Sequence, residues 1–358
     1  MNRPTGFFRS WHLWLALAVA AGAAARLMFL GTPAFEVDGI MYSISWSRMP
    51  LRFLLFGLLM GHTHPPLQFI VSWVAHAIFG ESEWALALPS VLFGVCALVM
   101  LWVWAAGTGR RIFGFAAVGL LSFNLYHIYW SQHPRMYSLL MFCSIGLLWA
   151  AETLSSRSGR GRIAAFSIFL FGTLGAHFFG VVPASVACAF VLWKLFRSLR
   201  RDEPAVSSSF AVRLFYAMAI PAILLLPWYG QFLVSLLNRG EAYEGVRPDS
   251  PPVPVDLPLV KTVVGAYGFG TTWLIYLFMA LVLIGVWRLV RSKRRSLLAF
   301  ETAWLVLPYA AFSLVPTGHF FDPSYTSSTA PVLWLWAGGG IAVLAARAGR
   351  LWPALRSP

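Results

Sequence analysis

The sequence has little charge: only 11% of its 358 residues are Asp, Glu, Lys or Arg, against about 25% in an ordinary soluble domain. This excludes a soluble globular enzyme, because a composition that is 59% hydrophobic leaves too little polar surface to cover a globule in water. A disordered chain is also excluded, since such chains are poor in aromatics and this one has 29 Phe and 17 Trp. The remaining class is an all-α polytopic membrane protein, and the length accommodates about ten spans of ~20 residues.

Acidic residues and cysteines are also scarce. The 13 acidic residues stand against 27 basic ones, which gives a net charge of +14. We expect no nucleic-acid partner, because the basic residues lie in short clusters between apolar runs, as in the cytoplasmic loops of multispan proteins. The three cysteines, Cys96, Cys143 and Cys188, all lie inside apolar runs, which indicates small core residues and not a disulfide set or a metal site.

The apolar runs and the basic clusters together predict a topology. If every main cluster of Lys and Arg is cytoplasmic, ten apolar runs cross the membrane in alternating directions, and both termini are expected in the cytoplasm. The N-terminal run also resembles a secretory signal peptide, but it continues through Leu30 and the alternation requires it, so we expect it to be retained. The ten predicted spans are 12–31, 86–106, 112–128, 137–153, 163–178, 179–197, 214–233, 270–290, 298–316 and 330–348.

The first outer loop, residues 32–85, contains two further apolar segments. Residues 66–80 open with a proline and are short for a span, so we expect a helix that lies in or dips into the outer membrane face. Residues 39–60 place Arg48 and Arg52 on one helical face beside apolar residues, which is typical of an interfacial helix. Pro50 predicts a break in that helix.

The predicted spans are nearly free of charge, which argues against an ion or proton transporter. We expect one transmembrane domain over residues 1–358 without a soluble C-terminal domain, and chemistry at the extracytoplasmic face of an inner or plasma membrane. The outer loops are 32–85, 127–137 and 234–269, with a further loop before the last span.

Two motifs in the first outer loop carry chemistry. Glu36 and Asp38 are spaced i, i+2 just before Tyr42, and such a pair can be a general base with its orienting partner or a set of metal ligands. Solvated loop acids are the alternative. His62 and His64 form a His-x-His pair that suits a metal or hydrogen bonding to an anion.

Two later segments add further candidates. Arg135 lies among aromatics and can hold a phosphate through its planar fork, although an arginine at this depth can also snorkel to lipid headgroups. Its neighbours His133 and Tyr137 share the predicted outer loop or its edge, and His319 and Tyr325 precede the last span.

The order and spacing of several motifs over residues 24–140 resemble the membrane glycosyltransferases of the GT-C fold. The closest resemblance is to bacterial relatives of protein O-mannosyltransferases and of lipid A aminoarabinose transferase. Beyond residue 140 the resemblance consists of hydropathy and the His319 loop. The matching elements are Arg26-Leu27-Met28-Phe29-Leu30, Val37-Asp38-Gly39, His64-Pro65-Pro66-Leu67, Phe79-Gly80-Glu81-Ser82-Glu83, Leu88-Pro89-Ser90, Gly109-Arg110-Arg111-Ile112-Phe113-Gly114 and Ser131-Gln132-His133-Pro134-Arg135-Met136-Tyr137.

The resemblance implies inverting transfer of a hexosyl or mannosyl unit from a polyprenyl-phosphate-linked donor. The acceptor is a protein, a lipid or a glycan. The matching catalytic residues are Asp38 as base and Glu36 as the second carboxylate. The residues expected at the donor phosphate are Arg135, His64 and His319, and those expected at other parts of the substrate are Tyr42, His62, His133, Tyr137 and Tyr325.

No cofactor is expected, although oligosaccharyltransferase catalytic subunits use a divalent ion held by several acids. Residues 127–138 contain no acid that would complete such a site. Two departures keep an alternative open: Gly39 stands where the family has a second acid, and Ser324 stands where it often has Arg. The chain would then be a non-catalytic structural subunit of a membrane complex. A lipid flippase is a further alternative, which the uncharged spans weaken.

Overall fold

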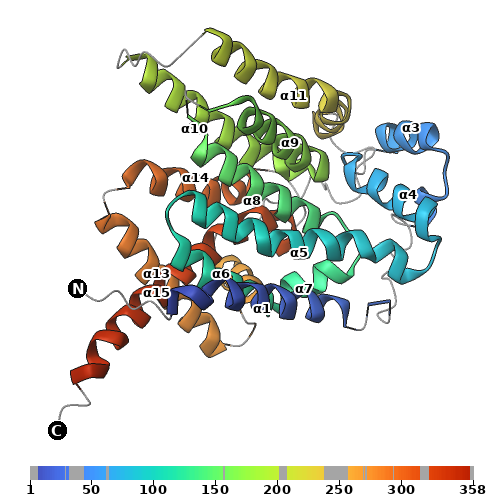
Figure 1. Cartoon of the computed structure of the whole chain (residues 1–358). Coiled ribbons are helices and arrows are strands. Elements are labelled where there is room, and N and C mark those ends of the chain that lie inside the picture. The colour runs from blue at the N-terminus through green and yellow to red at the C-terminus, as the bar shows by residue number, and fades with distance from the viewer. Residues whose placement is uncertain are drawn as a thin grey trace.

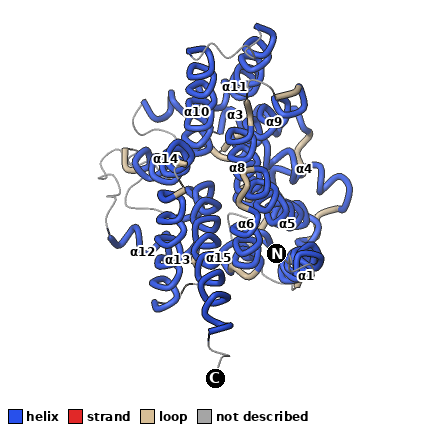
Figure 2. The backbone as a smooth tube through the Cα atoms, turned by 60° about the vertical axis from the view of Figure 1, so that its left-hand side comes forward, coloured by secondary structure: helices blue, strands red, loops and turns tan. Residues whose placement is uncertain are grey.

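The computed structural model describes the chain as helices joined by short connections. The described residues are 7–28, 30–31, 44–61, 64–155, 158–200, 208–237, 257–268, 270, 272–292, 294–314 and 322–354. Figure 2 shows the described part as helix and loop only, which agrees with the all-α expectation.

Each of the ten predicted spans coincides with a helix or a pair of helices. The helices are α1 (Phe7–Leu27), α3 (Leu51–Gly61), α4 (Leu67–Phe79), α5 (Glu83–Gly107), α6 (Arg111–Ser122), α7 (Leu125–Gln132), α8 (Tyr137–Thr153), α9 (Arg160–Ala176), α10 (Val181–Arg200), α11 (Ser208–Leu237), α12 (Leu257–Tyr267), α13 (Thr272–Arg291), α14 (Arg295–Phe312) and α15 (Ala330–Ala354). Two 3₁₀ segments, η2 (Phe178–Gly180) and η3 (Pro323–Thr329), precede α10 and α15.

Five helical stretches in the described part are long and apolar enough to cross a membrane: Glu83–Gly107, Phe178–Arg200, Ser209–Val234, Trp273–Arg291 and Pro323–Gly349. Helices α6 and α7 together pass the same test, but they bend by 63° at the break between them. The other predicted spans coincide with α1, α8, α9 and α14, which fall outside this set. The membrane character is therefore clear, while the count of ten spans stays a prediction.

The predicted cytoplasmic connections meet at one end of the bundle. Arg294 Nη1 donates to the Thr108 carbonyl at 2.6 Å and joins the α13–α14 and α5–α6 connections. Lys194 Nζ donates to the Ala151 carbonyl at 3.1 Å and joins the end of α10 to the end of α8. Figure 1 shows the start of α1 and the end of α15 towards this end, on the left, with α3 and α4 on the right. We call it the arginine-rich end, since the basic clusters predicted to be cytoplasmic gather there.

The outer segments contain more helix than the sequence predicts. Helix α3 begins directly after Pro50, as expected, and α4 has 13 residues, which span about 20 Å against a hydrocarbon core of ~30 Å. Residues 127–137, expected as a loop, are helical as far as Gln132. The expected loop 234–269 contains α12. Short apolar helices at a membrane face are hard to distinguish from loops by hydropathy alone.

The bend between α6 and α7 is held by a buried arginine. Arg26 of α1 donates to the Leu121 and Ser122 carbonyls at 3.0 and 3.1 Å, which are among the last carbonyls of α6. A helix leaves its last carbonyls without intrahelical partners, and the guanidinium satisfies two of them. Arg26 also contacts His127 Nδ1 at 2.6 Å, so one side chain ties α1 to both sides of the bend.

Glycines bring α13 and α15 into close contact. A Cβ at Gly285 would collide with the Trp336 carbonyl, and one at Gly340 would collide with the Leu281 carbonyl. Small residues let the backbones of membrane helices approach, and dispersion contacts then replace a hydrophobic driving force that lipid does not supply.

Candidate functional site

Residues from four separate parts of the chain form an aromatic and cationic cluster at the end of α8 opposite to the arginine-rich end. The His64 ring lies 5.3 Å from the His177 ring, and His177 lies 6.0 Å from Tyr137 and 5.7 Å from Tyr325, all between centroids. The guanidinium carbon of Arg135 lies 5.9 Å from the centre of the Tyr137 ring. We call this group, His64, Arg135, Tyr137, His177 and Tyr325, the histidine–arginine cluster.

Local backbone features position the cluster. His64 precedes Pro65 and Pro66, which fix the entry into α4. Arg135 lies in the turn between α7 and α8, and its carbonyl accepts from Ser90 Oγ at 3.5 Å. Tyr325 lies in η3, whose first turn is capped because Asp322 Oδ1 accepts from the Ser324 amide at 2.7 Å.

His177 ends α9 and begins η2, and it is only 3% exposed. Its Nδ1 accepts from the Phe179 amide at 3.1 Å. In a neutral imidazole one nitrogen accepts and the other carries the proton, so Nε2 carries the proton of His177. Nε2 is buried and has no hydrogen-bond partner among the described residues. A buried N–H donor in this state suits a ligand with acceptor oxygens.

The cluster combines one cation with buried and half-buried rings. Burial lowers the pKa of His64 well below its ordinary value, and the nearby His177 and Arg135 lower it further. His64 is therefore neutral at pH 7, and Arg135 supplies the positive charge. In water-excluded surroundings such a charge attracts an anion more strongly than it would in bulk solvent.

The structure brings together four of the residues singled out from the sequence: His64, Arg135, Tyr137 and Tyr325. His133 makes a different set of contacts: its ring lies 4.0 Å from Tyr129 and its Nδ1 lies 2.8 Å from the Tyr129 carbonyl. Its ring also lies 6.1 Å from Trp130, which contacts Tyr137. The other predicted site residues lie outside the described residues: Glu36, Asp38, Tyr42, His62 and His319. The expectation that the site uses no metal stays a prediction, since both candidate carboxylates are among these.

The sequence analysis missed His177. The residue stands in a Gly-Ala-His-Phe-Phe-Gly segment where two predicted spans adjoin without a polar loop. Ionisable residues at such depth are costly and usually functional, and this was the available signal. Arg26 was noticed only as part of the Arg26-Leu27-Met28-Phe29-Leu30 motif. Three of its four partners, two carbonyls and a histidine, lie 95 to 101 positions away in the sequence.

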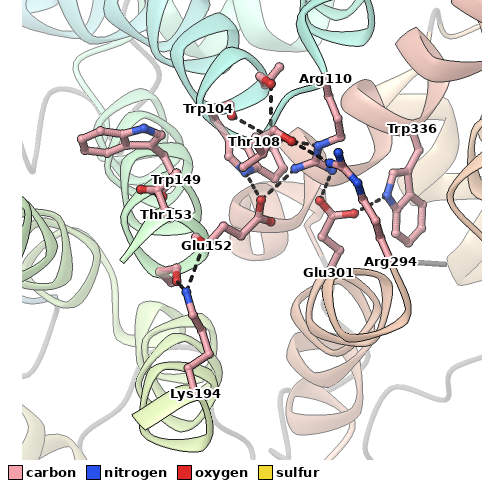
Figure 3. A network of polar contacts seen from close by, with 12 residues as sticks. Trp104, Thr108, Arg110, Trp149, Glu152, Thr153, Lys194, Arg294, Glu301 and Trp336 are labelled. Atoms are coloured by element: carbon pink, nitrogen blue, oxygen red, sulfur yellow. Dashed lines mark hydrogen bonds and ion pairs between the residues drawn. The ribbon is translucent and has the colours of Figure 1, made fainter. Parts of the chain in front are cut away.

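A second polar cluster lies at the arginine-rich end (Figure 3). Arg110 donates through Nη2 to Glu152 at 2.8 Å and through Nη1 to Glu301. Trp104 Nε1 donates to Glu152 Oε2 at 2.9 Å, and Trp336 Nε1 donates to Glu301 Oε2 at 2.7 Å. Nothing in the sequence indicated that these two glutamates share one buried cation. Because these contacts join α5, α8, α14 and α15 through Arg110, we assign this cluster to stability.

The two clusters are well separated. Tyr137 begins α8 and Glu152 lies near its end, so at 1.5 Å per residue they are about 22 Å apart along the helix. The histidine–arginine cluster is thus at the end predicted to face outward.

Comparisons with known proteins bear on the family and the fold. Residues 63–222 match a family model described as dolichyl-phosphate-mannose-protein mannosyltransferase. No curated protein matches the chain by sequence. Among solved structures, the chain is similar to apo ArnT from Cupriavidus metallidurans, with a TM-score of 0.64 and 16% identity over 94% of this chain and 60% of that one.

Two further structures share the fold. ArnT from the same organism bound to undecaprenyl phosphate gives a TM-score of 0.59 with 18% identity, covering 95% of this chain and 60% of that one. The oligosaccharyltransferase of Archaeoglobus fulgidus, in complex with Zn and sulfate, gives 0.55 with 11% identity, covering 94% and 49%. The chain thus spans about 60% of the length of the ArnT structures it resembles.

Proposed function

We propose that this chain, a membrane protein of the GT-C fold related to the dolichyl-phosphate-mannose-protein mannosyltransferases, transfers a sugar from a polyprenyl-phosphate-linked donor to an acceptor. The histidine–arginine cluster is the observation that carries the proposal. One guanidinium, a neutral histidine with a buried N–H and two tyrosines meet there, and phosphate recognition uses these donor types.

The chemistry of the reaction fits these residues. When the glycosidic bond breaks, negative charge develops on the lipid phosphate that leaves. Donors already fixed in a site without water stabilise such charge at no cost of reorganisation. Arg135 holds two phosphate oxygens through its fork, His177 Nε2–H donates to the same anion, and His64 lines the pocket. His319 is the remaining candidate for this role.

The attacking side of the reaction requires a base. Asp38 removes the acceptor proton, with Glu36 as the second carboxylate, and a single displacement gives inversion. General-base help of this kind contributes typically 10²–10⁴-fold. Tyr42, His62, His133, Tyr137 and Tyr325 contact other parts of the substrates.

The donor class and the face of the membrane follow from separate arguments. The similar ArnT is bound to undecaprenyl phosphate, and the matched family model names a mannosyl donor, which support a polyprenyl phosphate carrying a hexosyl or mannosyl unit. The positive-inside rule places the arginine-rich end in the cytoplasm. The histidine–arginine cluster then faces the extracytoplasmic side of an inner or plasma membrane.

Binding of polyprenyl phosphate to purified variants tests the proposal. Arg135→Ala should weaken binding by about 10- to 100-fold, the range for a lost hydrogen bond to a charged group. Arg135→Lys should recover only part of it, because an ammonium is a point charge without the fork. Arg52→Ala is the matched control: this arginine lies over Phe53 on α3 and makes no described contact with the cluster.

Unchanged binding in Arg135→Ala would overturn the phosphate site. Donor binding without transfer to any protein, lipid or glycan acceptor would favour the alternative of a non-catalytic subunit in a membrane complex.

A further inference from the structure

A cavity of about 600 Å³ opens at the arginine-rich end, where α1, the start of α6 and the end of α13 meet. It plays no part in the proposed transfer, since α8 separates that end from the histidine–arginine cluster. Its lining consists of Trp14, Gly109, Arg110, Arg111, Ile112, Phe113, Phe115, Arg288, Leu289, Ser292 and Arg294.

The polar side of the cavity carries uncompensated positive charge. Arg110 is neutralised by Glu152 and Glu301, but the described ion pairs include none for Arg111, Arg288 or Arg294, and no acidic residue is among the lining side chains. Arg294 is fixed at the rim, because its Nη1 donates to the Thr108 carbonyl at 2.6 Å. Three arginines thus line one space without a counterion from the described chain.

The remaining walls are apolar and open to the surroundings. Trp14 is 55% exposed and Ile112 is 64% exposed, and both lie on helices whose other faces carry apolar residues. In a membrane this surface meets acyl chains, and a tryptophan near a helix end is typical of the level of the headgroups. The cavity therefore combines a cationic part and a lipid-facing part.

We propose that this cavity binds one anionic phospholipid of the leaflet at the arginine-rich end. The phosphate lies among Arg111, Arg288 and Arg294, and the acyl chains lie along Trp14, Ile112 and Phe115. Basic pockets between membrane helices on the cytoplasmic side recognise anionic headgroups in this way. The bound lipid fills the contact between α1 and α13 beside the buried Arg110 cluster and compensates the charge that the chain leaves unpaired.

Native mass spectrometry of the detergent-solubilised protein, titrated with phosphatidylglycerol or with phosphatidylcholine of the same acyl chains, tests this site. Phosphatidylglycerol should bind more tightly. An arginine near an anionic lipid contributes an interaction equivalent to about fivefold in affinity, so Arg111→Gln with Arg288→Gln should weaken phosphatidylglycerol binding by roughly 25-fold. Arg111→Lys with Arg288→Lys should retain most of it, which separates lost charge from lost folding.

The control is Arg291→Gln with Arg347→Gln, since these arginines lie at the same end but over Trp287 and outside the lining. An equal loss of phosphatidylglycerol affinity in the control variant would mean that diffuse surface charge attracts the lipid, and it would overturn the site. Equal affinity for the two lipids would also overturn it, as would glycerol phosphate binding as tightly as the whole lipid.

Discussion

The His64 and His177 rings lie 5.3 Å apart, although His64 precedes α4 and His177 follows α9. His64 belongs to a motif that can be recognised in the sequence. His177 stands where two apolar runs adjoin and belongs to no recognised motif. Their contact, with Arg135 nearby, joins an isolated motif to a buried histidine and to a cation.

We expect His177→Phe to lower affinity for polyprenyl phosphate by about 10-fold or more, because it removes a buried N–H donor to a charged group. The ring shape is largely kept, so the protein should still fold. Lipid binding to the purified variant is the measurement, with His12→Phe as control, since His12 is exposed on α1. Affinity equal to that of the parent would exclude Nε2 as a phosphate donor.

Asp38→Asn should reduce transfer by ~10²-fold or more while leaving donor binding unchanged, because it removes basicity and keeps size. Turnover with radiolabelled donor and binding of the unlabelled lipid would be measured on the same preparation. If transfer persists in Asp38→Asn and disappears in Glu36→Gln, the base is Glu36.

Glu301→Gln should destabilise the protein by about 2 kcal/mol, because the buried Arg110 and Trp336 donors then share a neutral acceptor in place of a charged one. Thermal unfolding followed by tryptophan fluorescence measures this. Glu81→Gln is the matched control, since its pair with Arg48 is solvent-exposed and screened by water. Similar destabilisation in both variants would contradict the role assigned to the buried cluster.

The stability of the fold should also depend on pH through His64. Burial, with His177 and Arg135 nearby, lowers the pKa of its imidazole well below the ordinary 6.5. As the pH falls below that value, the unfolded chain takes up a proton that the folded chain does not, and the free energy of unfolding decreases. The melting midpoint should therefore drop between about pH 7 and about pH 5. His64→Asn should show a flatter decline, and a decline of the same slope would contradict this assignment.

The sequence by itself determined the class of the protein and the positions of its helices. The thickness of the bilayer sets the length of each apolar span. The cost of moving Lys and Arg across the bilayer sets the side on which the basic clusters lie. The predicted span 137–153 and helix α8 have the same bounds for this reason. Arg135 and His64 were also found from the sequence, because a guanidinium and a His-Pro-Pro segment stand out in a chain with few polar residues.

Only the tertiary structure decided which polar residues meet. Arg26 caps α6 through backbone carbonyls. Every residue has such a carbonyl, so the sequence does not indicate which of them accept from Arg26. Glu152 and Glu301 lie 149 positions apart, and both pair with Arg110, which precedes them by 42 and 191 positions. His177 joins the site because α9 ends beside the entry to α4. Each of these contacts depends on how helices of similar hydropathy pack, and packing in a membrane is set by shape and hydrogen bonding more than by the hydrophobic pattern.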